Sequence, residues 1–139
     1  MVINETEITV RYQETDQMGV VYHANYFVWF EIGRTRLIEQ LGFNYSDMEN
    51  EGVLAPVIDI QAKYKKPVRY GERAIVKTKI DHYDGLRVTY GYAIYTEENE
   101  LSVTGTSTHI CVNKSTFRPI RLKKHFPDWH EAYLKASEE

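Results

Sequence analysis

The sequence predicts a single α+β domain in which one long helix packs on an antiparallel sheet. Residues 26–41 carry apolar side chains at the three- and four-residue spacing of an amphipathic helix. Residues 57–112 instead alternate apolar and polar side chains between short polar turns, as half-buried strands do. No repeat or linker interrupts the 139 residues. One helix followed by a run of strands therefore indicates one domain over residues 1–139, with one layer of each.

A first strand is expected before the helix, because Ile8, Val10 and Tyr12 alternate with polar residues. The helix itself is bracketed by two recognisable end signals. Asn25 is a typical N-cap residue, and Gly42 is a typical residue just beyond a helix C-terminus. These signals predict a helix of about four to five turns, at about 3.6 residues per turn.

The strands after the helix are separated by turn signals. Asp84-Gly85 predicts a hairpin with a type I′ turn, and the polar residues 97–100 predict a second turn. A short helix is expected near residues 128–135. The buried positions expected on the strands are Ile58, Ile60, Ala62 and Tyr64; Ala74, Val76, Thr78 and Ile80; Val88, Tyr90, Tyr92 and Ile94; and Val103, Gly105, Ser107, His109 and Cys111.

Small residues indicate where the helix and the sheet meet. Gly33 in the middle of the helix costs helix stability, and close approach of another backbone is the usual compensation. The last long strand presents mostly small residues on one side, as expected where a helix lies against it. On that side, His109 is expected to be a hydrogen-bonded core histidine, and Cys111 a small hydrophobic residue rather than a nucleophile.

Composition and charge restrict the classes of function. A hydrophobic content of 42% supports a real core, and a formal net charge of −3 argues against a nucleic-acid partner. No apolar run reaches the roughly 20 residues of a membrane span, and the N-terminus lacks the pattern of a signal peptide. Cys111 is the single cysteine, which favours a reducing compartment. We expect a cytoplasmic protein without a membrane span, a metal or a resident cofactor.

The segment ETDQMGVVYHANY, residues 14–26, places Asp16 seven positions before His23, with Gly19 between them. The predicted helix follows directly. An aspartate in such a loop commonly accepts backbone N–H groups and has a structural role. Alternatively, Asp16 is a strong base that faces a pocket. The residues by themselves leave both readings open.

Residues 11–34, RYQETDQMGVVYHANYFVWFEIGR, resemble the signature of the 4-hydroxybenzoyl-CoA thioesterase-like family of hotdog-fold acyl-CoA thioesterases. That signature has an aspartate, a glycine three residues later, a Val-Tyr or Val-Trp pair, an Asn-Tyr pair and then a long helix. The segment KPVRYGE, residues 66–72, extends the resemblance. It implies the hotdog fold, a curved antiparallel sheet wrapped around one long central helix. It also implies hydrolysis of an acyl-CoA thioester to a free acid and coenzyme A.

The resemblance also implies roles for individual residues. Asp16 matches the catalytic carboxylate, either as general base on water or as a nucleophile that forms a transient anhydride. The backbone N–H of His23 matches the oxyanion position at the helix N-terminus. Gly19 would let the loop backbone approach the thioester closely. The candidates for lining the acyl pocket are Tyr22, Tyr26, Val57 and Ile58. The candidates for contact with the coenzyme A phosphates are Lys65, Lys66, Arg69 and Arg87.

Two other functions remain open at this point. A non-catalytic acyl-CoA sensor or scaffold would keep the pocket but could lose the base, whereas Asp16 is present. Hotdog hydratases and dehydratases resemble relatives with an aspartate and a histidine five residues apart, whereas Asp16 and His23 are seven apart. No sequence pattern indicates which acyl group is bound, or whether the acyl group is carried by coenzyme A or by an acyl carrier protein.

The predicted sheet also has consequences for assembly. A curved sheet with one helix leaves strand edges open, which favours pairing with a second copy. The resemblance implies homodimers, often paired again into homotetramers, with the active site between protomers. We therefore expect Asp16 of one subunit to lie opposite residues 57–66 of its partner.

Overall fold

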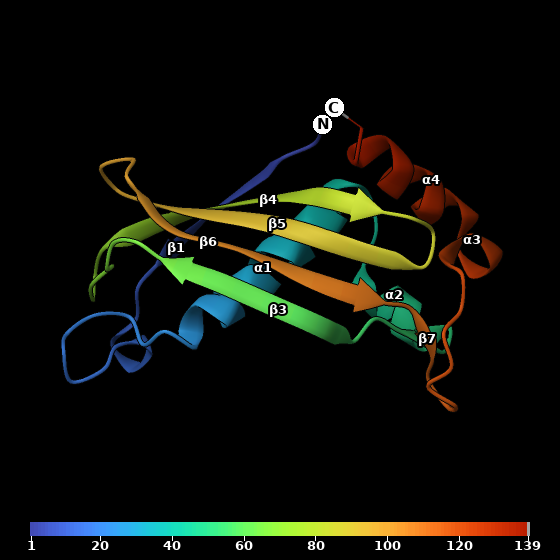
Figure 1. Cartoon of the computed structure of the whole chain (residues 1–139), viewed down its shortest axis with the longest axis horizontal. Helices are drawn as coiled ribbons and strands as arrows, with labels where there is room; N and C mark the ends of the chain where they lie inside the picture. The colour runs from blue at the N-terminus through green and yellow to red at the C-terminus, as the bar shows by residue number, and fades with distance from the viewer. Residues whose placement is uncertain (139) are drawn as a thin grey trace.

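The computed structural model describes residues 1–138 and confirms the predicted fold. A five-stranded antiparallel sheet, in the order β1-β4-β5-β6-β3, packs against the long helix α1 (Asn25–Gln40). Figure 1 shows α1 crossing behind the sheet, as the hotdog architecture requires. The strands are β1 (Asn4–Thr9), β3 (Val57–Tyr64), β4 (Arg73–Tyr83), β5 (Arg87–Thr96) and β6 (Leu101–Ile110).

The order of the strands leaves β1 and β3 at the two edges. Consecutive strands pair through hairpins from β4 to β5 and from β5 to β6, whereas β3 pairs with β6 and β1 with β4. The connection from β3 to β4 therefore crosses from one edge of the sheet toward the other. On β3, Ile58 and Tyr64 are exposed by 50% and 48%, although alternation predicted a buried face, because an edge strand is covered on one side only.

The close approach predicted at Gly33 is confirmed, but side chains of β4 cause it rather than backbone. A Cβ on Gly33 would lie 2.3 Å from Oγ1 of Thr78. At Gly105 of β6 a Cβ would lie 2.6 Å from the ring of Phe30. That ring also stacks on Tyr92 at 4.2 Å with an interplanar angle of 4°. Helix and sheet are thus in direct contact at the centre of the domain, where any larger side chain would overpack.

The ends of the first elements differ from the prediction. The helix already includes Asn25, and Ala24 is its N-cap, because the Asn25 side chain donates instead to the carbonyl of Glu14 at 2.8 Å. Gly42 has a φ of +100°, so the predicted C-terminal signal is confirmed. Tyr12 belongs to the 3₁₀ turn η1 (Tyr12–Glu14) rather than to the first strand, and it is 77% exposed.

The hairpin at Asp84-Gly85 is confirmed, but its turn is not type I′. The N–H of Asp84 donates to the carbonyl of Arg87, so Gly85 and Leu86 are the central residues of the turn. Gly85 has a φ of +92°, whereas Leu86 is not in the positive-φ region that a type I′ turn requires at both central residues. Instead, Oδ1 of Asp84 accepts the N–H groups of Leu86 and Arg87 at 2.9 and 2.7 Å. The aspartate therefore forms the turn through its side chain.

Smaller elements that the periodicity did not reveal cover one end of the sheet (Figure 1). The predicted C-terminal helix is present as α4 (Pro127–Ala136). No helix within residues 1–138 is both long enough and apolar enough to cross a membrane. The additional elements are α2 (Tyr45–Asn50), the two-stranded sheet of β2 (Val53–Leu54) and β7 (Val112–Asn113), and α3 (Leu122–His125).

Candidate active site

Glu14 ties the loop that carries Asp16 to helix α1. Its side chain is buried, and its carboxylate accepts the Nε1–H of Trp29 and the backbone N–H of Arg11, both at 2.8 Å. Its carbonyl accepts the N–H of Tyr22 at 2.9 Å. Burial acts to raise the pKa of Glu14, but the hydrogen bonds from Trp29 and Arg11 outweigh it and leave the pKa lowered. Sequence reasoning missed Glu14, because a partner fifteen residues away follows no local pattern.

Asp16 begins a tight turn in this loop. The N–H of Gly19 donates to the Asp16 carbonyl at 2.9 Å, and Gly19 has a φ of +79°, which glycine adopts without strain. Oδ1 of Asp16 accepts the N–H of Met18 at 2.8 Å, as the purely structural reading predicted. Oδ2 has no hydrogen-bond partner within residues 1–138. The loop therefore holds one carboxylate oxygen in place and leaves the other available.

A groove of about 280 Å³ collects many of the predicted site residues. Tyr64, at the end of β3, closes one side and donates its O–H to the carbonyl of His23 at 3.3 Å. Gly19 lies in the adjoining turn, outside the groove lining. The predicted residues that line this groove are Asp16, His23, Tyr26, Lys65 and Lys66.

Among the described residues, the two that directly precede Asn25 of α1 present free backbone donors beside this groove. The N–H of Asn25 donates to the carbonyl of Tyr22, but within residues 1–138 the N–H groups of His23 and Ala24 have no acceptor. The exposed ring of His23 packs against Tyr22, with ring centroids 4.4 Å apart. Unpaired amides and the positive end of the helix dipole favour a negatively charged oxygen here. This is the arrangement that an oxyanion hole needs.

The structure does not bring the other predicted residues into the groove of the same chain. Val57 and Ile58 lie exposed at the far end of β3 from Tyr64, and Arg87 lies at that same far end, at the start of β5. Arg69 pairs with Val20 behind the groove without lining it. Lys66 is at the groove but also forms an ion pair with Glu100.

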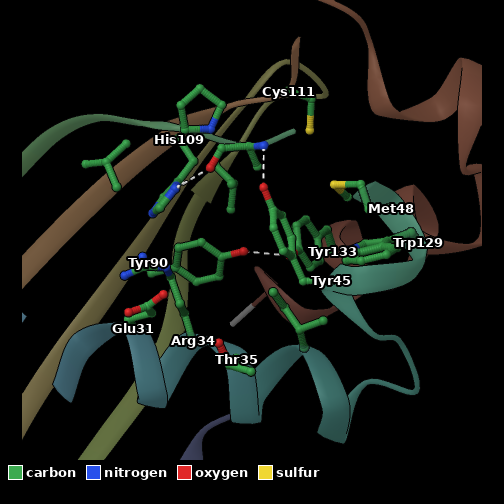
Figure 2. Close-up of a pocket in the computed structure, with 15 residues that line it drawn as sticks. Glu31, Arg34, Thr35, Tyr45, Met48, Tyr90, His109, Cys111, Trp129 and Tyr133 are labelled. Carbon is green, nitrogen blue, oxygen red and sulfur yellow. Dashed lines mark hydrogen bonds between the residues drawn. The ribbon is translucent and has the colours of Figure 1, made fainter. Parts of the chain in front are cut away.

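A second cavity, also of about 280 Å³, lies at the far end of the sheet between α1, α2 and α4 (Figure 2). His109 lies in its wall and is 3% exposed. Because a carbonyl only accepts, Nδ1–H of His109 donates to the carbonyl of Ala55 at 3.0 Å. Nε2 of His109 then accepts from Oγ of Ser107 at 2.9 Å, and Ser107 in turn accepts from the hydroxyl of Tyr92 at 2.6 Å. The prediction of a hydrogen-bonded core histidine is confirmed.

Burial sets the ionisation of the cavity side chains. It lowers the pKa of His109 to about 4, assisted by the nearby positive charge of Arg34 and opposed by the bond to Ala55. It also raises the pKa of Cys111 to about 11. The histidine is therefore neutral and the cysteine protonated near pH 7. Cys111 is a poor nucleophile, as predicted.

A long helix wrapped by a five-stranded antiparallel sheet is the architecture of the hotdog-fold thioesterases. Residues 10–134 match the Thioesterase-like superfamily, and the chain belongs to that family.

Two kinds of relatives support this membership. YneP of Bacillus subtilis (strain 168), which is named a putative acyl-CoA thioesterase, is 60% identical over 98% of this chain and 99% of its own length. The DHNA-CoA thioesterase of Staphylococcus aureus matches with a TM-score of 0.95 and 50% identity, over 97% of this chain and 91% of that chain. Protein TT1821 of Thermus thermophilus matches with a TM-score of 0.90 and 30% identity, over 99% of this chain and 100% of that chain.

Proposed function

We propose that this thioesterase hydrolyses acyl-CoA thioesters to a free acid and coenzyme A, with Asp16 as the catalytic carboxylate. One observation carries the proposal: the Asp16 carboxylate lines the groove at which the unpaired N–H groups of His23 and Ala24 begin helix α1. Thioester hydrolysis needs a base or nucleophile near the carbonyl carbon and donors where the oxyanion develops. The names of the B. subtilis and S. aureus relatives support a coenzyme A thioester as substrate.

The geometry of the groove suggests a chemical role for each of its residues. With Oδ1 of Asp16 held by Met18, Oδ2 either takes a proton from water or attacks the thioester carbonyl carbon directly. The carbonyl oxygen becomes negatively charged and is stabilised by the His23 and Ala24 amides. On the general-base route, the C–S bond then breaks and Asp16 returns its proton to the departing sulfur, so coenzyme A leaves as the thiol. On the nucleophilic route, breaking the C–S bond leaves an anhydride on Asp16, which water hydrolyses to release the acid, restore the carboxylate and supply the proton of the thiol. Lys65 and Lys66 at the groove are suited to its phosphates.

The far position of Val57 and Ile58 supports a site shared between two copies. If two β3 edges pair antiparallel about a twofold axis at the middle of the strand, Tyr64 of one copy faces the partner's Val57. Exposed apolar side chains on this open edge favour such pairing. Asp16 would then act opposite residues 57–66 of the partner, and Arg87 of the partner would approach the same groove.

A charge on the β3 edge is expected to separate the two copies. Ile58→Lys places an ammonium where two β3 strands would meet, so the protein should sediment as a monomer and lose most of its turnover. Ile3→Lys is the matched control, because Ile3 and Ile58 are both 50% exposed and Ile3 lies outside the proposed interface. Sedimentation velocity and thiol release test both variants. A wild-type protein that is active as a monomer would contradict the shared site.

Hydrolysis itself is tested by thiol release from a panel of aliphatic and aromatic acyl-CoAs. Turnover of at least one thioester by the wild-type protein is the expected result. Tight binding of an acyl-CoA without turnover would support a sensor instead. Loss of the enoyl absorbance of crotonyl-CoA without thiol release would support a hydratase.

A further inference from the structure

We propose that residues 113–127, called here the basic surface, dock the protein onto an anionic lipid bilayer. The basic surface runs from the end of β7 through α3 to the start of α4. None of its residues lines the Asp16 groove, so docking does not depend on the proposed hydrolysis. Two features point to a lipid surface: an excess of positive charge without partners, and an exposed aromatic ring beside that charge.

Positive charge is concentrated on the basic surface. Residues 113–127 contain five lysines and arginines and no aspartate or glutamate, whereas the rest of the chain holds 12 positive and 20 negative side chains, a net charge of −8. All five cations are exposed, and within residues 1–138 none of them forms an ion pair. Such a surface favours an external anionic partner. The five cations are Lys114, Arg118, Arg121, Lys123 and Lys124.

The basic surface lies at one end of the molecule. Figure 1 shows the orange segment after β7, together with α3, at the opposite end from the blue loop that carries Asp16. Salt screens the interaction of exposed charges beyond about 8 Å at physiological ionic strength. A flat bilayer that touches this end is therefore attracted by the five cations, while most of the acidic remainder lies out of its reach. A nucleic acid lying across the domain would meet that acidic remainder as well.

An exposed aromatic ring stands beside these charges. Phe117 is 59% exposed and has a φ of +58°, a left-handed conformation that is strained for a bulky residue. Its N–H donates to the carbonyl of Asn113 at 2.8 Å, and Oδ1 of Asn113 accepts two further N–H groups of the loop at 2.9 and 3.1 Å. Strain at an exposed position calls for a functional reason. A phenylalanine between Lys114 and Arg118 is suited to insertion at the level of the lipid headgroups.

The basic surface is formed before any partner binds. Leu122 of α3 is 2% exposed, and its N–H donates to the carbonyl of Gly85 at 3.2 Å. The N–H of Ile120 donates to the carbonyl of Cys111 at 2.9 Å. Because these contacts fix the backbone, docking orders little of the chain and loses little conformational entropy. An open groove of about 600 Å³ on this surface combines apolar and cationic side chains: Pro119, Ile120, Arg121, Lys123, Lys124 and His125.

Cosedimentation with lipid vesicles tests the docking. The wild-type protein should bind vesicles that contain phosphatidylglycerol, bind vesicles of phosphatidylcholine alone much less, and lose its binding at high salt. Each lysine near an anionic surface contributes about a fivefold factor, so the double variant Lys123→Gln and Lys124→Gln should bind about 20- to 30-fold more weakly. The charge-matched control is Lys77→Gln and Lys79→Gln, because each of these β4 lysines forms an ion pair with a carboxylate. The control should bind like the wild type.

A further variant separates docking from a structural role of the ring. Phe117→Gly should weaken vesicle binding about tenfold, because it removes the inserted apolar surface. It should nevertheless unfold at the same temperature as the wild type or higher, since glycine adopts a φ of +58° without strain. Tyr70→Ala is the control, because Tyr70 is 62% exposed and lies outside the basic surface. Unchanged vesicle binding in Phe117→Gly would contradict the proposal.

Three other results would overturn it. If the wild type does not bind anionic vesicles, the basic surface does not serve a membrane, and an acidic protein is the partner to seek. If the Lys123 and Lys124 variant and the Lys77 and Lys79 variant lose equal binding, only net charge matters. If free coenzyme A displaces the wild type from vesicles, the surface binds the phosphates of the substrate. Thiol release without vesicles should be unchanged in the Lys123 and Lys124 variant, so failure of docking and failure of hydrolysis are distinguishable.

Discussion

Asp16→Asn is expected to reduce kcat for thiol release by about 10²- to 10⁴-fold without unfolding the protein. The amide keeps an Oδ1 that still accepts the N–H of Met18, so the turn from Asp16 to Gly19 is preserved. What it removes is the negative charge, and with it the ability to take a proton from water or to attack a carbonyl carbon. Circular dichroism and thiol release on the same preparation measure fold and rate.

The matched control for this substitution is Asp84→Asn. Asp84 is the loop aspartate that forms the β4–β5 turn through its side chain, and it accepts two backbone N–H groups there. Turnover in this variant should stay near that of the wild type. If Asp16→Asn and Asp84→Asn are equally active, Asp16 is structural, and its hydrogen bond to Met18 is its whole function.

Acidification is expected to destabilise the protein by about 2 to 3 kcal/mol between pH 7 and pH 4.5, because of His109. The pKa of His109 is lowered from 6.5 to about 4 in the folded protein. In this pH range the unfolded chain binds a proton that the folded chain excludes. The contribution of neutral His109 is therefore complete above pH 6.5 and is lost as the pH falls toward 4. Protonation would also break its bond with Ser107, since Nε2 could no longer accept.

Urea unfolding at a fixed protein concentration measures this dependence, since the proposed dimer would make stability depend on concentration. His109→Gln should be less stable than the wild type at pH 7 and should lose much less stability on acidification. His125→Gln is the control, because His125 is exposed on α3 and should retain the wild-type dependence. An equal acid sensitivity in His109→Gln would assign the effect to other groups, such as the buried carboxylate of Glu14.

Local periodicity was sufficient to predict the helix, the central strands and their buried faces. The alternation along β4 and β5 corresponds directly to burial, because these strands have neighbours on both sides and the helix on one face. The same reasoning failed for β3, where Ile58 and Tyr64 are exposed. The alternation of apolar and polar residues shows which side chains share a face of the sheet. It does not show whether that face is buried at an edge strand.

The candidate site was predictable to the extent that it is contiguous in sequence. Asp16, His23 and Tyr26 belong to one segment, and the structure places them at one groove with Lys65 and Lys66. Glu14 escaped notice for another reason. Its importance depends on a distant contact, the hydrogen bond from Trp29. Such roles follow from packing, which no spacing rule encodes.

The contact between Phe30 and Gly105 sets the spacing between helix and sheet. Because that ring lies against backbone in the middle of the domain, even the methyl group of an alanine at position 105 would have to push α1 away from the sheet. The amides at the N-terminus of α1 would move with the helix, so a substitution in the core would also shift the groove that holds Asp16.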